Sequence, residues 1–469
     1  MANSIIEQQP ARTVLPVGQD VIFVVSNDDA VGFQTRVKFV AEVHIKNGAI
    51  SLSNTSSRIG VFKTTPNNAG VGIFNFRNIV ENYVNAQHIA GFKSTYKGVS
   101  SDGKNHPIHL IDKLSLQDDI LRYFAVQFKV EYLGADVTKP NEVNIADGTA
   151  ANSVQFKITN AYLKHTDVLT FSTDPNNPNG FGYDITKFKP SDTSKQFLTN
   201  LPTTLYANIN DYGTVGILQT ESDMWDNARK VKFTYYEPDG TTTTETYSKG
   251  ASTGAFFGWS TDGRKQILLL GMYPANLRNW SSTFPASTIE GGYYTVQLLD
   301  NSNTPTSKLY TINVNCPDEK QFESIRLCWL NQWGVWDYYT FNKKSTTKIN
   351  SQETTYQQLE GTWNERVYSI GGFRGGKKTF RRNSTESIAI NTDFVTEDYN
   401  TVFQELINSP EVFMLKGFQT DVADSVLNQY VIPVRLTTKD FTTKTISNDK
   451  LIQYSFNIEK SLTLRTQSV

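Results

Sequence analysis

The clearest structural signal in this sequence is Val231-Lys232-Phe233-Thr234-Tyr235-Tyr236, followed by Glu237-Pro238-Asp239-Gly240 and a return from Thr241 to Tyr247. Both flanks are rich in β-branched and aromatic residues, which suit a pleated, half-buried surface. The Pro-Asp-Gly sequence between them is typical of a tight turn. The stretch therefore predicts a β-hairpin, and it favours a mainly β protein around it.

Strand signals continue in both directions from this hairpin. The run Val21-Ile22-Phe23-Val24-Val25 is apolar throughout, as in a strand of a sandwich core. The segment 36–45 alternates polar and apolar residues over most of its length and is followed by the turn pair Asn47-Gly48. Further strands are predicted over 123–132, 154–158, 293–299, 308–314, 431–436 and 451–458, of which 293–299 and 308–314 form a second hairpin.

Helical signals are few. Apolar residues recur at helical spacing within 76–84, which predicts one short helix. A second helix is predicted over 396–407, with Thr396 as its N-cap and Asn408-Ser409-Pro410 as its end.

Length and composition fit several β domains. The chain has 469 residues, enough for about three domains of ordinary size. Polar stretches at 173–180 and 315–320 divide it into predicted domains at 1–165, 166–318 and 319–469. We therefore expect a mainly β fold of several β-sandwich-like domains with a few short helices.

The charge balance limits the classes of partner. Lys and Arg number 45 and Asp and Glu 46, a net charge of −1, which argues against broad nucleic-acid binding. The start of the sequence lacks the basic and apolar segments of a signal peptide. The longest aliphatic run in the middle of the chain, Ile267 to Leu270, is far too short for a membrane span. We expect a protein made in a cytoplasm, with no membrane span.

Two motifs resemble ligand sites only weakly. Gly371 to Lys378 approaches a phosphate-binding loop, but Lys378 stands where a hydroxyl is required, and a strand-like segment follows in place of a helix. His106 and His109 lie near Asp102 and Asp112, in a Ser-, Gly- and Asn-rich context. That context favours a surface loop over a metal site.

The remaining sequence offers no catalytic motif. Cys316 and Cys328 form no CxxC pair and have no histidine nearby, so zinc is not expected, and free thiols are favoured over a disulfide. No G-x-S-x-G nucleophile elbow occurs. The sequence therefore predicts a non-enzymatic protein with no catalytic residue, metal or cofactor.

The densest basic run comprises Arg374, Lys377, Lys378, Arg381 and Arg382. We interpret it as a loop, for which two roles stay open. One is an ordinary solvated loop. The other is a loop that faces DNA or an acidic partner and, in a ring of copies, lines a channel.

The most distinctive stretch runs from Arg326 to Phe341, with a tight turn predicted at Asn331 to Gly334 between two strands. The favoured interpretation of its aromatic residues is a belt in a sandwich core. The alternatives are a contact between subunits and a sugar-binding platform. The candidates for a contact between subunits are Trp329, Trp333, Trp336, Tyr338 and Phe341.

This hairpin also resembles a known group of proteins. The pattern Trp329-Leu330-Asn331-x-x-Gly334-x-Trp336-Asp337-Tyr338-Tyr339-Thr340-Phe341 is similar to a hairpin of structural proteins from tailed bacteriophages, particularly crAss-like and related phages of Bacteroidetes and marine hosts. Segments with the same resemblance are 63–68 with 70–76, 270–277, 409–413 and 448–451. The resemblance thus extends over most of the chain.

The resemblance implies a virion component of the tail, the collar or the ring assembly below the portal, with no catalytic residues to carry over. The expected partners are further copies of the chain, other tail and collar proteins, and DNA passing through a channel. Proteins that self-assemble commonly close into symmetric rings.

Two alternatives stay open beside the virion component. One is a receptor- or glycan-binding protein of a virion or cell surface, with Trp280, Trp333, Trp336 and Tyr338 as candidates. The other, and the least favoured, is a glycan-degrading enzyme, which needs two converging carboxylates.

Overall fold

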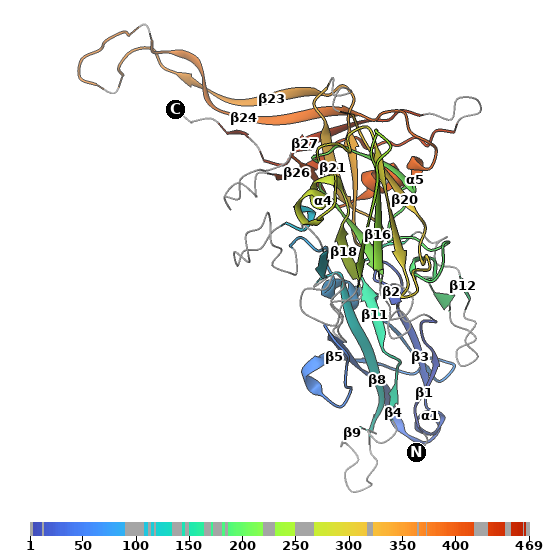
Figure 1. Ribbon diagram of the computed structural model, residues 1–469. Helices are drawn as coiled ribbons and strands as arrows, with labels where there is room; N and C mark the ends of the chain where they lie inside the picture. Colours follow the sequence, from blue (N-terminus) through green and yellow to red (C-terminus); the bar gives the residue numbers. More distant parts are fainter. Residues whose placement is uncertain are drawn as a thin grey trace. The chain divides into compact units, whose positions relative to one another are not determined.

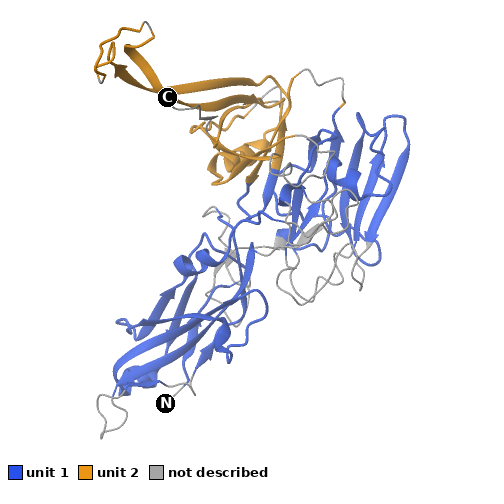
Figure 2. Ribbon diagram, turned by 90° about the vertical axis from the view of Figure 1, so that its left-hand side faces the viewer, with its two compact units in different colours: residues 1–315, 330–337 blue, residues 316–329, 338–469 orange. Residues whose placement is uncertain are grey.

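The computed structural model describes residues 3–11, 14–89, 107–110, 114–116, 119–133, 143–145, 150–163, 170–171, 181–182, 186–218, 230–248, 267–316, 322–363, 365–371, 373–416, 430–445, 452–462 and 464–465. The chain packs as two compact units (Figure 2). Unit 1 comprises Met1–Asn315 and Leu330–Asp337, and unit 2 comprises Cys316–Trp329 and Tyr338–Val469. The division into three domains stays a prediction.

The protein is mainly β, with several separate sheets and a few short helices, which confirms the predicted fold class (Figure 1). No helix in the described part of the chain is long and apolar enough to cross a membrane. Apart from those of the hairpins and of unit 2, given below, the strands are β1 (Ile5–Gln8), β2 (Val14–Pro16), β3 (Ile22–Ser26), β4 (Thr35–Lys46), β5 (Arg58–Thr64), β6 (Val71–Asn75), β7 (Leu114–Leu116), β8 (Leu121–Leu133), β9 (Val143–Ile145), β10 (Ala151–Asn152), β11 (Phe156–Thr159), β12 (Thr170–Phe171), β13 (Phe181–Gly182), β14 (Thr204–Ala207), β15 (Thr214–Leu218) and β18 (Ile267–Gly271).

The first strands form a β-sandwich within unit 1. One sheet has the order β1-β3-β6, and the other has the order β2-β11-β8-β4-β5, with β9 and β10 also paired to β8. Phenylalanines fill the core between the sheets, because alternate residues of each strand point inward. The ring of Phe23 in β3 lies 5.5 Å from that of Phe128 and 6.2 Å from that of Phe124, both in β8.

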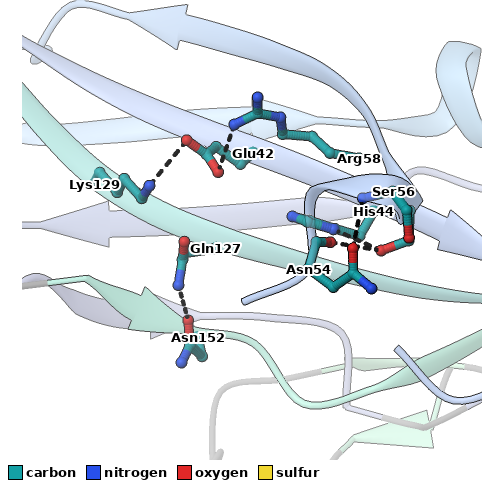
Figure 3. A network of polar contacts seen from close by, with 9 residues as sticks. Glu42, His44, Asn54, Ser56, Arg58, Gln127, Lys129 and Asn152 are labelled. Carbon is teal, nitrogen blue, oxygen red and sulfur yellow. Dashed lines mark hydrogen bonds and ion pairs between the residues drawn. The ribbon is translucent and has the colours of Figure 1, made fainter. Parts of the chain in front are cut away.

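Part of the outer face of the larger sheet carries a network of polar contacts (Figure 3). Glu42 in β4 accepts hydrogen bonds from Lys129 at 2.9 Å and Arg58 at 3.2 Å, and Gln127 donates to Asn152 at 2.9 Å. Burial raises the pKa of Glu42, but the bonds from Lys129 and Arg58 outweigh it and leave the pKa below its usual range. Glu42, Lys129, Arg58, Gln127 and Asn152 thus find their partners on this face.

Both predicted hairpins of the middle region are confirmed. Strands β16 (Lys230–Tyr236) and β17 (Thr242–Ser248) pair antiparallel around a turn in which Gly240 has φ +90°. Strands β19 (Tyr293–Leu299) and β20 (Tyr310–Val314) pair likewise, and the sheet has the order β14-β20-β19-β16-β17. Helix α4 (Pro274–Trp280) follows β18 and packs Trp280 against Phe233 of β16.

The large sheet on which unit 2 is built has the order β22-β21-β25-β26-β27-β24-β23, and β28 pairs with β24. The hairpin ends of β21 and β22, within Leu330–Asp337, are counted with unit 1. The core of unit 2 lies under helix α5, whose Phe403 ring is 5.3 Å from that of Phe456 and 6.4 Å from that of Phe341. The strands are β21 (Ile325–Leu330), β22 (Trp336–Phe341), β23 (Thr346–Gln358), β24 (Gly376–Asn391), β25 (Val412–Leu415), β26 (Val431–Leu436), β27 (Ser455–Lys460) and β28 (Leu464–Arg465).

Both predicted helices are present at the predicted positions, but the predicted N-cap of the second is not. Helix α2 (Arg77–Val80) continues as a 3-10 turn and confirms the first short helix. Helix α5 (Tyr399–Asn408) confirms the second and ends where predicted. The predicted N-cap at Thr396 is wrong, since the helix begins three residues later behind Asp398. Helix α1 (Asp28–Phe33) was not predicted, since its six residues are too few for a helical period to show.

Candidate assembly surface

Strands β23 and β24 form the longest hairpin of the described chain, which we call the arm (residues 346–391; Figures 1 and 2). They pair from Thr346 opposite Ala389 to Gln358 opposite Gly376. Strands β27 and β28 cover β24 only as far as Asn383. Beyond that residue no described strand pairs with the arm. A two-stranded ribbon, roughly 20 Å long at about 3.3 Å per residue, therefore projects from the sheet of unit 2.

The sequence explains why the arm is extended and uncovered. Strand β23 reads TTKINSQETTYQQ, with frequent β-branched threonine and with polar residues on both faces. Threonine favours extended backbone because of its branched Cβ. A strand that packs on a core shows an apolar face, and β23 has none, so nearly all of its residues are exposed.

The tip of the arm, residues 359–375, carries exposed apolar side chains. A soluble chain seldom gathers large apolar side chains on one exposed element unless that element binds something. The tip is also held by its own bonds, because Thr362 Oγ1 donates to the Val367 carbonyl at 2.9 Å and accepts from the Ser369 amide at 2.8 Å. The exposed fractions are 69% for Leu359, 69% for Trp363, 75% for Val367, 71% for Ile370 and 76% for Phe373.

The predicted basic run lies on this arm. Arg374 belongs to the tip, whereas Lys377, Lys378, Arg381 and Arg382 lie on β24. The prediction of a loop is therefore wrong for these four residues, because pairing with the β-favouring β23 holds them in a strand. Residues 346–391 contain seven basic and four acidic residues, a net charge of +3.

Part of this positive charge is engaged within the arm. Arg382 donates to Glu353 of β23 at 3.0 Å, and its hydrogen bonds hold the pKa of Glu353 below the usual range. Lys378 donates to the Phe373 carbonyl, and the guanidinium of Arg374 lies 5.6 Å from the centre of the Phe373 ring. Lys377 and Arg381 are exposed.

The aromatic hairpin β21–β22 lies in the core instead. Trp336 donates its indole N–H to the Gln87 carbonyl at 2.8 Å, and its ring lies 4.7 Å from that of His109. The ring of Trp333 lies 4.5 Å from that of Phe188. The five candidates for a contact between subunits are at most 3% exposed: Trp329, Trp333, Trp336, Tyr338 and Phe341.

This burial favours the core interpretation of the hairpin over a subunit contact or a sugar platform. Trp280, a further glycan candidate, is half-buried and donates to the Gly271 carbonyl at 3.1 Å. The surface-loop prediction is wrong for His109, which is 2% exposed in a short 3-10 turn. The ring of His109 packs edge-on against Trp336, so His109 belongs to the core.

The predicted turn between β21 and β22 is confirmed, and Asn331 organises it. Its Oδ1 accepts from the amides of Trp333 at 3.0 Å and Val335 at 3.2 Å, and its Nδ2 donates to the Leu198 carbonyl at 3.0 Å. Gly334 has φ +79°, and a Cβ there would lie 2.1 Å from the Asn160 carbonyl oxygen. Only glycine fits at this position.

The described residues hold no group of three His, Cys, Asp or Glu side chains close enough to bind a metal ion. His106, Asp102 and Asp112 lie outside the described residues. Cys316 and Cys328 are free thiols. Burial raises the pKa of the Cys328 thiol, which makes it a poor nucleophile.

No family model and no curated protein matches this chain. Among solved structures it is similar to Salmonella alpha-2-macroglobulin reacted with methylamine, at 10% identity and a TM-score of 0.17, over 97% of this chain and 23% of that one. The native conformation of E. coli alpha-2-macroglobulin is matched at 8% identity and a TM-score of 0.18, over 99% of this chain and 31% of that one. The chain thus spans less than a third of their length. A similarity at these TM-scores indicates neither a shared fold nor a shared function.

The apolar tip was missed by the analysis of the sequence. Its apolar residues follow neither a strand period nor a helical period, so no pattern assigned them to an element. That lack of period was itself a signal. Large apolar residues that are flanked by polar strands and belong to no amphipathic element have no core to enter.

Proposed function

We propose that this protein is a structural component of a tailed-bacteriophage virion, in the tail or collar region, that assembles through its arm. The resemblance of several segments to such proteins supports the virion assignment. The observation that carries the assembly role is the exposed apolar tip of the arm. In this proposal the chain is made in the host cytoplasm, forms a ring with further copies and joins other tail or collar proteins.

The arm suits assembly for physical reasons. A projecting ribbon reaches a neighbouring chain without moving the core that holds it. Burying exposed apolar area contributes about 25 cal/mol per Å², and association is driven mainly by such burial. In a ring, the exposed Lys377 and Arg381 would be repeated around the assembly, where they would face an acidic partner or DNA.

Electron microscopy of intact particles and of the purified full chain tests this proposal. We expect a closed ring on the particle axis, with the arm at a contact between chains. Replacing Phe373 by Asp should shift the purified chain toward monomer in mass photometry. Tyr206→Asp is the matched control, because Tyr206 is 62% exposed but lies on β14. Assembly unaffected by Phe373→Asp, or a chain absent from particles, would contradict the proposal.

A second candidate function is glycan binding at the same tip. Trp363 and Tyr368 are 69% and 51% exposed, and their ring centres lie 5.0 Å apart at an interplanar angle of 56°. The apolar body of such rings packs against the C–H face of a sugar. A glycan array should then show binding that Trp363→Ala abolishes and Phe373→Asp leaves intact. An array without hits would remove this candidate.

A further inference from the structure

The three-stranded sheet of the sandwich has a largely apolar outer face, on which Ser26 and Asn75 are the polar exceptions in β3 and β6. Phe23, Val25 and Phe74 point into the core, and the residues that alternate with them point away from it. In the register, Val24 lies opposite Ile73, and Ser26 lies opposite both Ile5 and Val71. We call Ile5, Ile22, Val24, Val71 and Ile73 the outer apolar face; Ile5 is 56% and Ile73 is 53% exposed.

The other sheet of the same sandwich shows two ways in which an outer face is made compatible with water. One part of it carries the ion pairs and amide bonds around Glu42 and Gln127 (Figure 3). Another part is apolar, at Tyr123 and Ala125, and is covered by Ile50 of the same chain. An antiparallel sheet with one solvated face alternates apolar and polar residues. Strand β3, with the sequence IFVVS, is apolar on both faces, as a strand covered on both sides would be. We therefore expect another protein surface to pack on the outer apolar face.

The edges and rim of this sheet indicate the kind of cover. Strands β1 and β6 are its two edge strands, and neither pairs on its outer side with another described strand. Exposed edges accept further strands. The strands β1, β3 and β6 contain no Lys or Arg. Three exposed acidic residues lie on or beside them: Glu7, Asp20 and Asp28.

We propose that the outer apolar face receives the arm tip of a second copy of this chain, an inference that rests on the proposed function of the arm. Both the arm tip and the outer apolar face present exposed apolar side chains, which would be buried against each other in the contact. The arm carries a net charge of +3, and since the whole chain carries −1, the remainder carries −4. The exposed Lys377 and Arg381 thus complement the acidic rim of the sheet.

The contact joins two different surfaces of the same chain, so each copy has one donor arm and one receiving face. Such a heterologous contact does not stop at a dimer. It closes into a ring when the rotation between copies allows, and otherwise it extends into a filament. The same pair of surfaces therefore accounts for assembly into a ring.

Complementation between two full-length variants tests the contact. Ile73→Asp removes the receiving face and keeps the arm, whereas Phe373→Asp removes the arm tip and keeps the face. Each variant alone should be monomeric in mass photometry, with its Kd for self-association weakened by roughly 100-fold or more, as for an interface hot spot. Mixed together, the two variants should form one-to-one complexes and nothing larger, because each mixture retains one intact contact per pair.

Controls separate this inference from the proposed function. Val61→Asp, at a 45% exposed position on β5 of the other sheet, should leave assembly unchanged, and Ile5→Asp should repeat the effect of Ile73→Asp. Circular dichroism establishes that each variant is folded. If Phe373→Asp blocks assembly while both face variants assemble normally, the receiving face is overturned and the arm's role survives. A wild-type chain whose arm binds only a different virion protein would also overturn it.

Discussion

Two consecutive hairpins carry the same kinds of residue and use them in opposite ways. The hairpin β21–β22 buries Trp329 and Trp336 almost completely, whereas the tip of the arm leaves Trp363 and Phe373 more than two-thirds exposed. The turn of the first hairpin lies against Leu198 and its Trp336 bonds to Gln87, and both partners are more than a hundred residues away in sequence. The ribbon of the arm has no described strand beside it. Aromatic content alone therefore indicates neither a core nor an interface; what matters is which distant segments lie against it.

Matched tryptophan truncations should produce the largest difference between the hairpins. Trp336→Ala removes a buried ring and the hydrogen bond to Gln87, so we expect a loss of about 3–5 kcal/mol in the free energy of unfolding. Trp363→Ala should change it by less than about 0.5 kcal/mol, as exposed substitutions usually do. Calorimetric unfolding of both variants measures the two losses. Equal losses in the free energy of unfolding would contradict the contrast between a buried and an exposed hairpin.

Matched glycine substitutions should produce the next largest effect. Gly334 and Gly376 both have positive φ, near +80°, but a Cβ at Gly334 would meet the Asn160 carbonyl at 2.1 Å, and one at Gly376 would meet nothing within 4 Å. We expect Gly334→Ala to lose about 2–4 kcal/mol from strain and overlap. Gly376→Ala should lose only about 1 kcal/mol, from the backbone conformation alone. Thermal unfolding separates the two, and a mild Gly334→Ala would show that the turn relaxes.

Asp337, at the start of β22, should make the buried hairpin sensitive to pH. Burial raises the pKa of its carboxyl to about 7, although hydrogen bonds from Thr199, at 2.6 Å, and Asn331 act to lower it. Between about pH 4 and pH 7 the folded chain keeps a proton that the unfolded chain releases, so this group makes stability fall as pH rises through that window. Asp337→Asn should remove the dependence, measured as Tm between pH 4 and pH 8. Parallel Tm curves for the variant and the wild type would contradict it.

The smallest effect is expected at the ion pair of the arm. Arg382 and Glu353 are both exposed, and an ion pair in water contributes little to stability. Arg382→Ala should therefore leave Tm unchanged within measurement. A clear fall in Tm would mean that the ribbon depends on this cross-strand pair for its order, and would sharpen the contrast with the buried hairpin.

Local patterns predicted fewer than half of the strands of this fold, but among them are the long strands β4 and β8 and both hairpins of the middle region. Alternation over 36–45 and the Pro-Asp-Gly turn after Tyr236 identified β4 and the β16–β17 hairpin, because strand period and turn chemistry are read within a few residues. The turn at Asn331 to Gly334 was predicted for the same reason. The N-cap of α5 was misplaced, because the helix begins behind Asp398, whose side chain makes no capping hydrogen bond that a sequence pattern could reveal.

The sequence by itself determined the mainly β class, three of the hairpins (β16–β17, β19–β20 and β21–β22) and the positions of the aromatic and basic clusters, because these depend on short-range pattern and propensity. Tertiary structure alone decided which cluster is covered. It buried Trp336 against Gln87 and His109 and left the arm tip in solvent. It also left Ile5 and Ile73 of the outer apolar face without a cover among the described residues. Burial depends on contacts between residues far apart in the chain, and no local pattern contains that information.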